Sequence, residues 1–291
     1  MNIVRRIVKE EFPLFLASPT IVWQFLFLYL PLLVMIFFSF LSATEEGFRF
    51  SITLQHYFRI LKPVYLQIII NSFLLALSTS VLCLFIGFPI AYFISLKGGI
   101  WKMILLILII LPSWSNLIVQ IYAWFFLLDP NGLLSPLLRY IGVISKPLHI
   151  LNTIYAILIG MVYVFLPFMI LPIYAVLSKM DKKLLEASAD LGANRFNTLR
   201  RIVFPLSLPG IYTGFLLVFI PAFGEYAIPS LLGGSKYVFW GNVIVDKFLV
   251  VRDWSSGFAL AWSGIVFVIL ALLMLNVFSF LYKKLFSTFK D

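Results

Sequence analysis

The sequence has few charged residues, two histidines and a single cysteine, and each shortage excludes a class of protein. Charged residues make up 12% of the 291 positions, whereas soluble domains contain about 25%. This rules out a soluble globular domain, a disordered chain and a coiled coil. Cys83 has no second cysteine for an internal disulfide, and one cysteine with two histidines is too few for a Cys/His zinc cluster.

Sequence motifs of catalysis are also missing. The chain has no G-x-x-x-x-G-K-[ST] phosphate loop, and Gly233-Gly234-Ser235-Lys236 lacks its spacing. It has no G-x-S-x-G, no H-E-x-x-H and no pair of aspartates within an apolar segment. His56 and His149 fall in different expected loops, and we interpret both as solvated loop histidines. We therefore expect a non-catalytic chain without a cofactor of its own.

Apolar residues, by contrast, are abundant. They make up 62% of the sequence, and the mean hydropathy is +1.05. Lys, Arg, Asp and Glu divide the chain into long apolar stretches, each exceeding the roughly 20 residues that a spanning helix needs. An all-α integral membrane protein is expected, with six helices near 19–41, 66–95, 102–128, 152–178, 207–232 and 257–282. The first stretch has no small-residue cleavage site, so we expect no cleavable signal peptide.

The basic residues indicate the orientation. With both termini inside, the inner segments hold 14 Lys and Arg and the outer loops 8, as the positive-inside rule requires. The segments are then a cytoplasmic end at 1–18, a transmembrane domain at 19–282 and a cytoplasmic tail at 283–291. Because the basic residues border apolar spans and form no stripe with interleaved aromatics, they indicate a lipid bilayer and no nucleic acid.

Prolines interrupt several of the expected spans. A proline removes a backbone hydrogen bond, which lipid cannot replace. Ordinary kinks and helices broken around a pathway are both open interpretations for these positions, which are Pro89, Pro112, Pro167, Pro172, Pro221 and Pro229.

The loop at 179–205 is the only sizeable inner loop. Its apolar residues have helical spacing; Asp181 is a plausible N-cap and Gly192 a plausible C-cap, and a second basic helix is expected to lead into the fifth span. The loop could lie on the bilayer surface or accept a partner on its small residues.

The same loop resembles the EAA loop of ABC-importer permeases, E-A-A-x3-G-x9-I-x-L-P. The matching residues are Glu186-Ala187, Gly192, Ile202 and Pro205, while Ser188 and Phe204 depart from the pattern. In that family the loop forms a coupling helix that docks into the ATP-hydrolysing subunit. The resemblance implies that the docking residues are Glu186, Ala187, Ser188, Asp190, Leu191 and Gly192.

Further blocks narrow the resemblance to the permeases of spermidine/putrescine importers. They begin at Leu111-Pro112-Ser113-Trp114, Leu166-Pro167-Phe168, Pro221-Ala222-Phe223-Gly224-Glu225-Tyr226, Gly241-Asn242-Val243-Ile244 and Arg252-Asp253-Trp254. The resemblance implies a six-helix type I ABC importer permease fold (MetI-like) in the bacterial cytoplasmic (inner) membrane. It also implies a homologous second permease, two ATP-binding subunits that hold ATP-Mg, and an extracytoplasmic polyamine-binding protein.

Glu225 is the only Asp, Glu, Lys or Arg well inside an expected span. A charged side chain at the centre of a bilayer costs ~3 kcal/mol on translocon scales, so it usually faces a cavity or a partner. Pro221, Gly224 and Pro229 surround it and permit a locally opened helix. We expect Glu225, with the neighbouring Tyr226, to attract a cationic amine in transit. The alternatives are a carboxyl kept neutral and a carboxyl hydrogen-bonded structurally to a neighbouring helix.

The third span supplies a second group of candidates. Asn116, Gln120 and Trp124 have i, i+4, i+8 spacing and would share one helical face, with Trp114 and Tyr122 on the adjoining face. Aromatic faces attract ammonium groups by about 0.5–2 kcal/mol. A coincidence among the many aromatic residues and anchoring at the membrane interface are the alternatives. In the outer loops, Trp240 and Trp254 are open to two interpretations, interfacial anchors or docking contacts.

Three other functions remain open on the sequence. The same architecture could import another small organic cation or solute. A proton-coupled secondary transporter would use Glu225 as its proton site but gives the 179–205 loop no task. A membrane enzyme would need a second reactive group at the depth of Glu225, and the sequence offers none.

Overall fold

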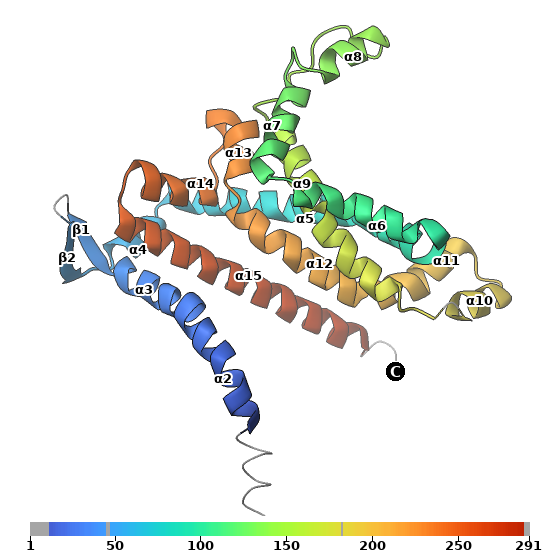
Figure 1. Cartoon of the computed structure of the whole chain (residues 1–291), viewed down its shortest axis with the longest axis horizontal. Helices are drawn as coiled ribbons and strands as arrows, with labels where there is room; N and C mark the ends of the chain where they lie inside the picture. The colour runs from blue at the N-terminus through green and yellow to red at the C-terminus, as the bar shows by residue number, and fades with distance from the viewer. Residues whose placement is uncertain (1–11, 45–46, 182, 288–291) are drawn as a thin grey trace, which may run out of the picture. The chain divides into compact units, whose positions relative to one another are not determined.

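The computed structural model describes the backbone of residues 12–44, 47–181 and 183–287, and nearly all of it is helical (Figure 1). Contacts divide the chain into two compact units. The first comprises residues 1–65 and 244–291, and the second residues 66–243. We describe each unit by itself.

The first unit contains the expected first and last spans. Its elements are α2 Phe12–Gln24, η2 Phe25–Tyr29, α3 Leu30–Ser39, β1 Leu41–Thr44, β2 Gly47–Ile52, α4 Gln55–Ile60, η7 Asp246–Val250 and α15 Trp254–Ser287. The helix α15 packs against α3 and α4. An antiparallel hairpin pairs Ala43 with Phe48 and follows the first span directly. The sequence predicted only a loop between the first and second spans.

His56 is buried in this unit, so the prediction that it is a solvated loop histidine is wrong. Its exposed fraction is 9%, and its two ring nitrogens lie 2.8 Å from the Ser256 hydroxyl and 3.3 Å from the Leu41 carbonyl. A carbonyl only accepts, so Nε2 donates to Leu41 O, while Nδ1 shares a hydrogen bond with the Ser256 hydroxyl. The histidine thereby ties α4 to β1 and α15.

The second unit contains the remaining spans and the 179–205 loop. Its elements are α5 Pro63–Lys97, η3 Gly99–Trp101, α6 Lys102–Ile110, η4 Leu111–Trp114, α7 Leu117–Leu128, α8 Leu134–Tyr140, α9 Ile154–Leu177, α10 Lys183–Asp190, α11 Arg195–Thr198, η5 Leu199–Val203, α12 Phe204–Gly224, α13 Ala227–Leu232, η6 Gly234–Lys236 and α14 Trp240–Val245. The first residues of α5 and the last of α14 belong to the first unit.

The helices α9 and α12 form the core of the second unit and pack along each other (Figure 1). Small residues permit this approach: a Cβ on Gly210 would lie 2.7 Å from the Pro172 carbonyl, and one on Gly214 would lie 2.9 Å from Met169 Sδ. Close backbone contact at glycines is a common way for helices to associate in lipid. The helix α5 joins this core through Phe73, whose ring is 5.5 Å from that of Phe219.

The described residues contain five helices long and apolar enough to span a membrane, or six if one bent pair is counted as a single span. The five lie at Ser18–Ser39, Pro63–Lys97, Ile154–Leu177, Arg195–Gly224 and Trp254–Met274. The six expected positions are thereby recovered, with two corrections to their shape. Pro89, Pro167 and Pro172 stay inside continuous helices.

The third span is not the continuous helix that the sequence predicted. Its halves, Gly99–Trp114 and Leu117–Leu128, meet at an angle of 95°. Ser115 and Asn116 have extended backbones, and the Asn116 side chain caps α7 by accepting from Ile118 N at 2.8 Å. The missing donor of Pro112 and this cap together favour ending one helix and starting another.

The fifth span also differs from the expected 207–232. It begins at Arg195 and its helix ends at Gly224. Residues 225–226 interrupt it, and α13 is a separate short helix. The expectation of a locally opened helix around Glu225 is therefore confirmed, while the predicted boundaries of the span are wrong.

Candidate functional site

The interruption between α12 and α13 presents the Glu225 carboxylate. The backbone of Glu225 is extended, with φ −67° and ψ 131°. Its Oε1 atom accepts hydrogen bonds from Ala227 N at 2.8 Å and Ile228 N at 3.4 Å. The side chain thus caps the start of α13 and satisfies two amides that the helix cannot.

Only one carboxylate oxygen takes part in this cap. Within the described residues, Glu225 forms no ion pair, and both hydrogen bonds of its side chain end on Oε1. The residue is half-buried. A carboxylate in a membrane-spanning segment is costly unless a cation or water compensates it. The geometry therefore combines a fixed side chain with a carboxyl group that has no cationic partner among the described residues.

The segment 239–242 holds this interruption in place. Asn242 donates from Nδ2 to the Tyr226 carbonyl at 3.2 Å and to Ser230 Oγ at 2.6 Å, and its Oδ1 accepts from Phe239 N at 3.1 Å. Gly241 lies against the carbonyls of Gly224 and Glu225, and a Cβ there would be 3.0 Å from the latter. Any side chain at 241 would push the segment away from the interruption.

Gly241 and Asn242 were not predicted from the sequence as structural determinants of the site. They entered it only as part of a family resemblance, since a short polar stretch in a loop carries no periodic signal. Trp240 is also different from expected: it is 1% exposed, and its amide donates to Ser72 Oγ of α5 at 2.8 Å. It is therefore neither an interfacial anchor nor a docking residue.

Gln120 stabilises the bend in the third span. Its Nε2 lies 2.7 Å from the Pro112 carbonyl, 3.1 Å from the Ser115 carbonyl and 2.9 Å from Ser115 Oγ. The side chain is buried. The Pro112 carbonyl also accepts from Ser115 N at 3.1 Å and Ser115 Oγ at 2.8 Å, so Gln120 adds a bond there and supplies a donor to the Ser115 carbonyl at the bend.

The structure brings together only part of the predicted polar–aromatic face. Gln120 and Trp124 line one recess of about 320 Å³ together with Ser115 and Tyr163, and the rings of Trp124 and Tyr163 are 5.3 Å apart, edge to face. Asn116 precedes α7 as its cap, so the prediction of one continuous face is wrong. The short helix α13 packs against α7, which places the two interruptions on neighbouring elements (Figure 1).

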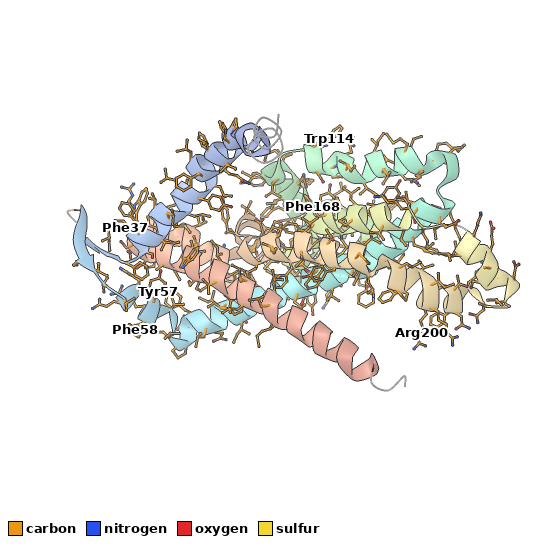
Figure 2. All side chains as sticks on the ribbon, turned by 90° about the horizontal axis from the view of Figure 1, so that it is seen from below. Phe37, Tyr57, Phe58, Trp114, Phe168 and Arg200 are labelled. Atoms are coloured by element: carbon orange, nitrogen blue, oxygen red, sulfur yellow. The ribbon has the colours of Figure 1, made fainter. Side chains whose placement is uncertain are left out.

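Trp114, Tyr122 and Tyr226 are exposed in this chain. Trp114 is 79% exposed, and Figure 2 shows it on the outside of the ribbon. Neither Trp114 nor Tyr122 lines the recess around Gln120. Tyr226 follows Glu225 directly and is the aromatic side chain nearest to it in sequence.

The 179–205 loop has the helix and caps that the sequence predicted. Asp181 Oδ1 accepts from Lys183 N at 3.0 Å at the start of α10. At its end Gly192 has φ +75°, its amide donates to Ala189 O at 2.9 Å, and Ala193 N donates to Ser188 O at 3.0 Å. This is the Schellman pattern, which favours glycine at the left-handed position.

The six predicted docking residues divide into one buried and five exposed positions. Ser188 is buried, and its hydroxyl lies 2.8 Å from Thr198 Oγ1 of α11, so it joins the two helices of the loop. The exposed positions are Glu186, Ala187, Asp190, Leu191 and Gly192. Leu191 is 87% exposed, which leaves a large apolar side chain available to a partner.

Comparison with known proteins gives consistent matches. Residues 84–289 match the family model of the "Binding-protein-dependent transport system inner membrane component". The spermidine/putrescine transport system permease protein PotB of Escherichia coli (strain K12) is 41% identical over 257 residues, covering 88% of this chain and 92% of the relative. PotB of Haemophilus influenzae is 38% identical over 257 residues, covering 88% of this chain and 90% of the relative.

A solved structure shows the same fold. A chain of a bacterial ABC transporter involved in the import of the acidic polysaccharide alginate superposes with a TM-score of 0.71 at 18% identity, covering 96% of this chain and 98% of that one. A chain of an alginate transporter in complex with a pentasaccharide-bound periplasmic protein gives a TM-score of 0.70 at 19% identity, with coverage of 94% and 96%.

Proposed function

Since this chain belongs to the family of inner membrane components of binding-protein-dependent transport systems, we propose that it is the permease subunit through which an ATP-driven importer moves spermidine and putrescine. Relatives about 40% identical over most of their length are named as permeases for these polyamines. The location proposed for the chain is the bacterial cytoplasmic membrane, crossed several times.

Glu225 is the observation that carries the proposal for the substrate. Polyamines are flexible chains with an ammonium group at each end. A carboxylate held by the cap on α13, with one oxygen uncommitted and no cation beside it among the described residues, offers such a group a charged hydrogen bond, which is stronger than a neutral one. Tyr226, the next residue, adds an exposed aromatic ring that favours cations.

The third span contributes a second, weaker feature. The recess around Gln120 and Trp124 has an aromatic wall formed with Tyr163. We assign Trp124 the role of contacting the passing amine and Gln120 that of shaping the bend. We also propose that three further residues face the path in the assembled transporter: Trp114, Asn116 and Tyr122.

The proposed assembly supplies what this chain lacks. A homologous second permease would complete the path, and two ATP-binding subunits, which hold ATP-Mg, would dock on the α10 region through the exposed residues around Leu191. An extracytoplasmic binding protein would deliver the polyamine. ATP-driven closure of the ATP-binding subunits would then tilt the permeases and expose Glu225 to alternate sides. The segments proposed above, 1–18, 19–282 and 283–291, fit this topology.

Uptake of radiolabelled spermidine into proteoliposomes tests the proposal. The complete complex should accumulate spermidine only with ATP and binding protein, and a preparation without this chain should not. Uptake driven by a pH gradient alone would contradict an ATP-driven importer. If a loaded binding protein stimulates ATP hydrolysis while spermidine is not taken up, the permease assignment stands and the polyamine is the wrong substrate.

A further inference from the structure

The second unit contains a recess that the proposed transport path does not use. It has a volume of about 530 Å³ and lies between the C-terminal part of α5 and the start of the span at Arg195. Four aromatic rings, those of Phe88, Tyr92, Phe93 and Phe196, line it together with two cations, Lys97 and Arg195. A volume of this size suits a ligand-sized group.

The charge of the recess is positive and uncompensated. Lys97 and Arg195 are both exposed, and neither forms an ion pair within the described residues. No carboxylate contributes to the lining. The recess therefore attracts an anion, and its aromatic walls require that the rest of the ligand be apolar.

The position of the two cations relates the recess to a membrane surface. Lys97 is the last residue of one span and Arg195 the first residue of another, so both charges lie at the same border between lipid and water. Phe88 lies nine residues before Lys97 in a continuous helix, which extends the apolar wall ~13 Å into the bilayer. The many Lys and Arg at this end identify it as the cytoplasmic surface under the positive-inside rule.

We propose that this recess binds an acidic phospholipid of the cytoplasmic leaflet, such as phosphatidylglycerol. The headgroup phosphate accepts hydrogen bonds from the Lys97 ammonium and the Arg195 guanidinium, and one acyl chain lies along Phe88, Phe93 and Phe196. The lipid would join the end of α5 to α11, which follows α10 in the 179–205 loop. This inference requires a membrane-spanning chain but does not depend on which solute is transported.

Native mass spectrometry of the complete transporter, titrated with phosphatidylglycerol or phosphatidylethanolamine, tests the site. The wild type should retain phosphatidylglycerol preferentially. Because a basic residue near a membrane surface contributes about 1 kcal/mol, the double variant Lys97→Gln/Arg195→Gln should bind it roughly 30-fold more weakly. Leu199→Trp, which fills the recess without changing its charge, should also weaken retention.

Arg200→Gln is the matched control. Arg200 is an exposed cation in the same helical segment (Figure 2) but does not line the recess, so its removal should leave retention unchanged. Wild-type retention in the double variant would overturn the proposal. An equal loss of lipid retention in Arg200→Gln would also overturn it, because it would indicate unspecific charge attraction. So would a double variant that retains the lipid but loses the ATP-binding subunits, because the two cations would then contact a protein.

Discussion

At the scale of single residues, one polar side chain stabilises each of the two interrupted spans by hydrogen bonds to the backbone. Glu225 caps α13 with Oε1 and leaves its second carboxyl oxygen uncommitted, while Gln120 binds the carbonyls of the bent third span. An isosteric amide at 225 would still accept the hydrogen bonds of the cap. The charge and the cap are therefore separable by mutation.

Asn242 should be the residue whose loss most disturbs the Glu225 region. Asn242→Ala removes the donor to Tyr226 O and Ser230 Oγ and the acceptor for Phe239 N. Tyr226 O keeps its bond from Ser230 N, but Phe239 N loses its acceptor, and leaving such a group unsatisfied costs about 1–3 kcal/mol. We expect that loss in a denaturant titration of the purified transporter. Asn131→Ala, at an exposed position, is the control. Equal stability of both variants would contradict the role of Asn242 as a clamp that holds residues 226, 230 and 239 together.

Asp253 should make the stability of the first unit depend on pH. Burial raises the pKa of Asp253, but hydrogen bonds from Ser256 and the charge of Lys247, 3.5 Å away, outweigh it, so the pKa lies below its usual 3.8. Because its pKa is lowered in the folded state, the ionised carboxylate stabilises the fold at pH values above the unfolded-state pKa. This stabilisation is lost as the pH falls through the folded-state pKa.

The variant Asp253→Asn tests this charge, because the amide still accepts from Ser256 N. Its melting temperature should be below that of the wild type at pH 7, and the difference should shrink as the pH falls below about 4, the ordinary range of an aspartate. A difference that stays constant from pH 7 to pH 3 would mean that the charge of Asp253 is not the cause.

At the scale of elements, hydrophobic runs predict where the spans lie, because residence in lipid demands long apolar segments. Local capping patterns likewise predicted α10, since Asp181 and Gly192 act within the same segment. The bend at Ser115, the burial of His56 and the clamp by Asn242 were not predicted. Each depends on a side chain that binds a backbone or side-chain group outside its own helix, and such pairings leave no periodic pattern in a sequence.

Gln120 tests the origin of the bend in the third span. Gln120→Leu removes the donor to the Pro112 and Ser115 carbonyls and should cost about 1–3 kcal/mol of stability. Gln120→Glu should cost more, because an ionised carboxylate faces those oxygens without a proton to donate. Val119→Leu, at the adjacent exposed position, is the control. A Gln120→Glu variant as stable as the wild type would contradict the role of Gln120 in stabilising the bend.

Leu191 tests the partner contact of the α10 loop. Its side chain is almost fully exposed in this chain, so Leu191→Ser should leave the fold intact. If the ATP-binding subunits cover it, the variant should bind them more weakly, since burying a leucine contributes about 1.5–3 kcal/mol. Co-purification of the subunits measures this. Leu133→Ser, another exposed leucine, should have no effect; undiminished co-purification of Leu191→Ser would place the contact elsewhere.

At the scale of the whole molecule, the chain supplies spans and a structured loop but contains no phosphate-binding motif. Under the proposed function, ATP-binding partners supply the energy of transport and this chain contributes the path. Membership of the family of inner membrane components of binding-protein-dependent transport systems supports this proposed arrangement. The role of Glu225 is the most specific element of the account, since it relates the proposed substrate to one charge in a described geometry.

The most direct test is ATP-dependent spermidine uptake by transporters that contain Glu225→Gln. The amide preserves the cap on α13, so assembly and basal ATP hydrolysis should be unchanged. Uptake should fall at least tenfold, which corresponds to about 1.4 kcal/mol, while Asp129→Asn, a charge removed from a loop, should transport like the wild type. Wild-type uptake by Glu225→Gln would contradict the account, because the cation would then cross without this carboxylate.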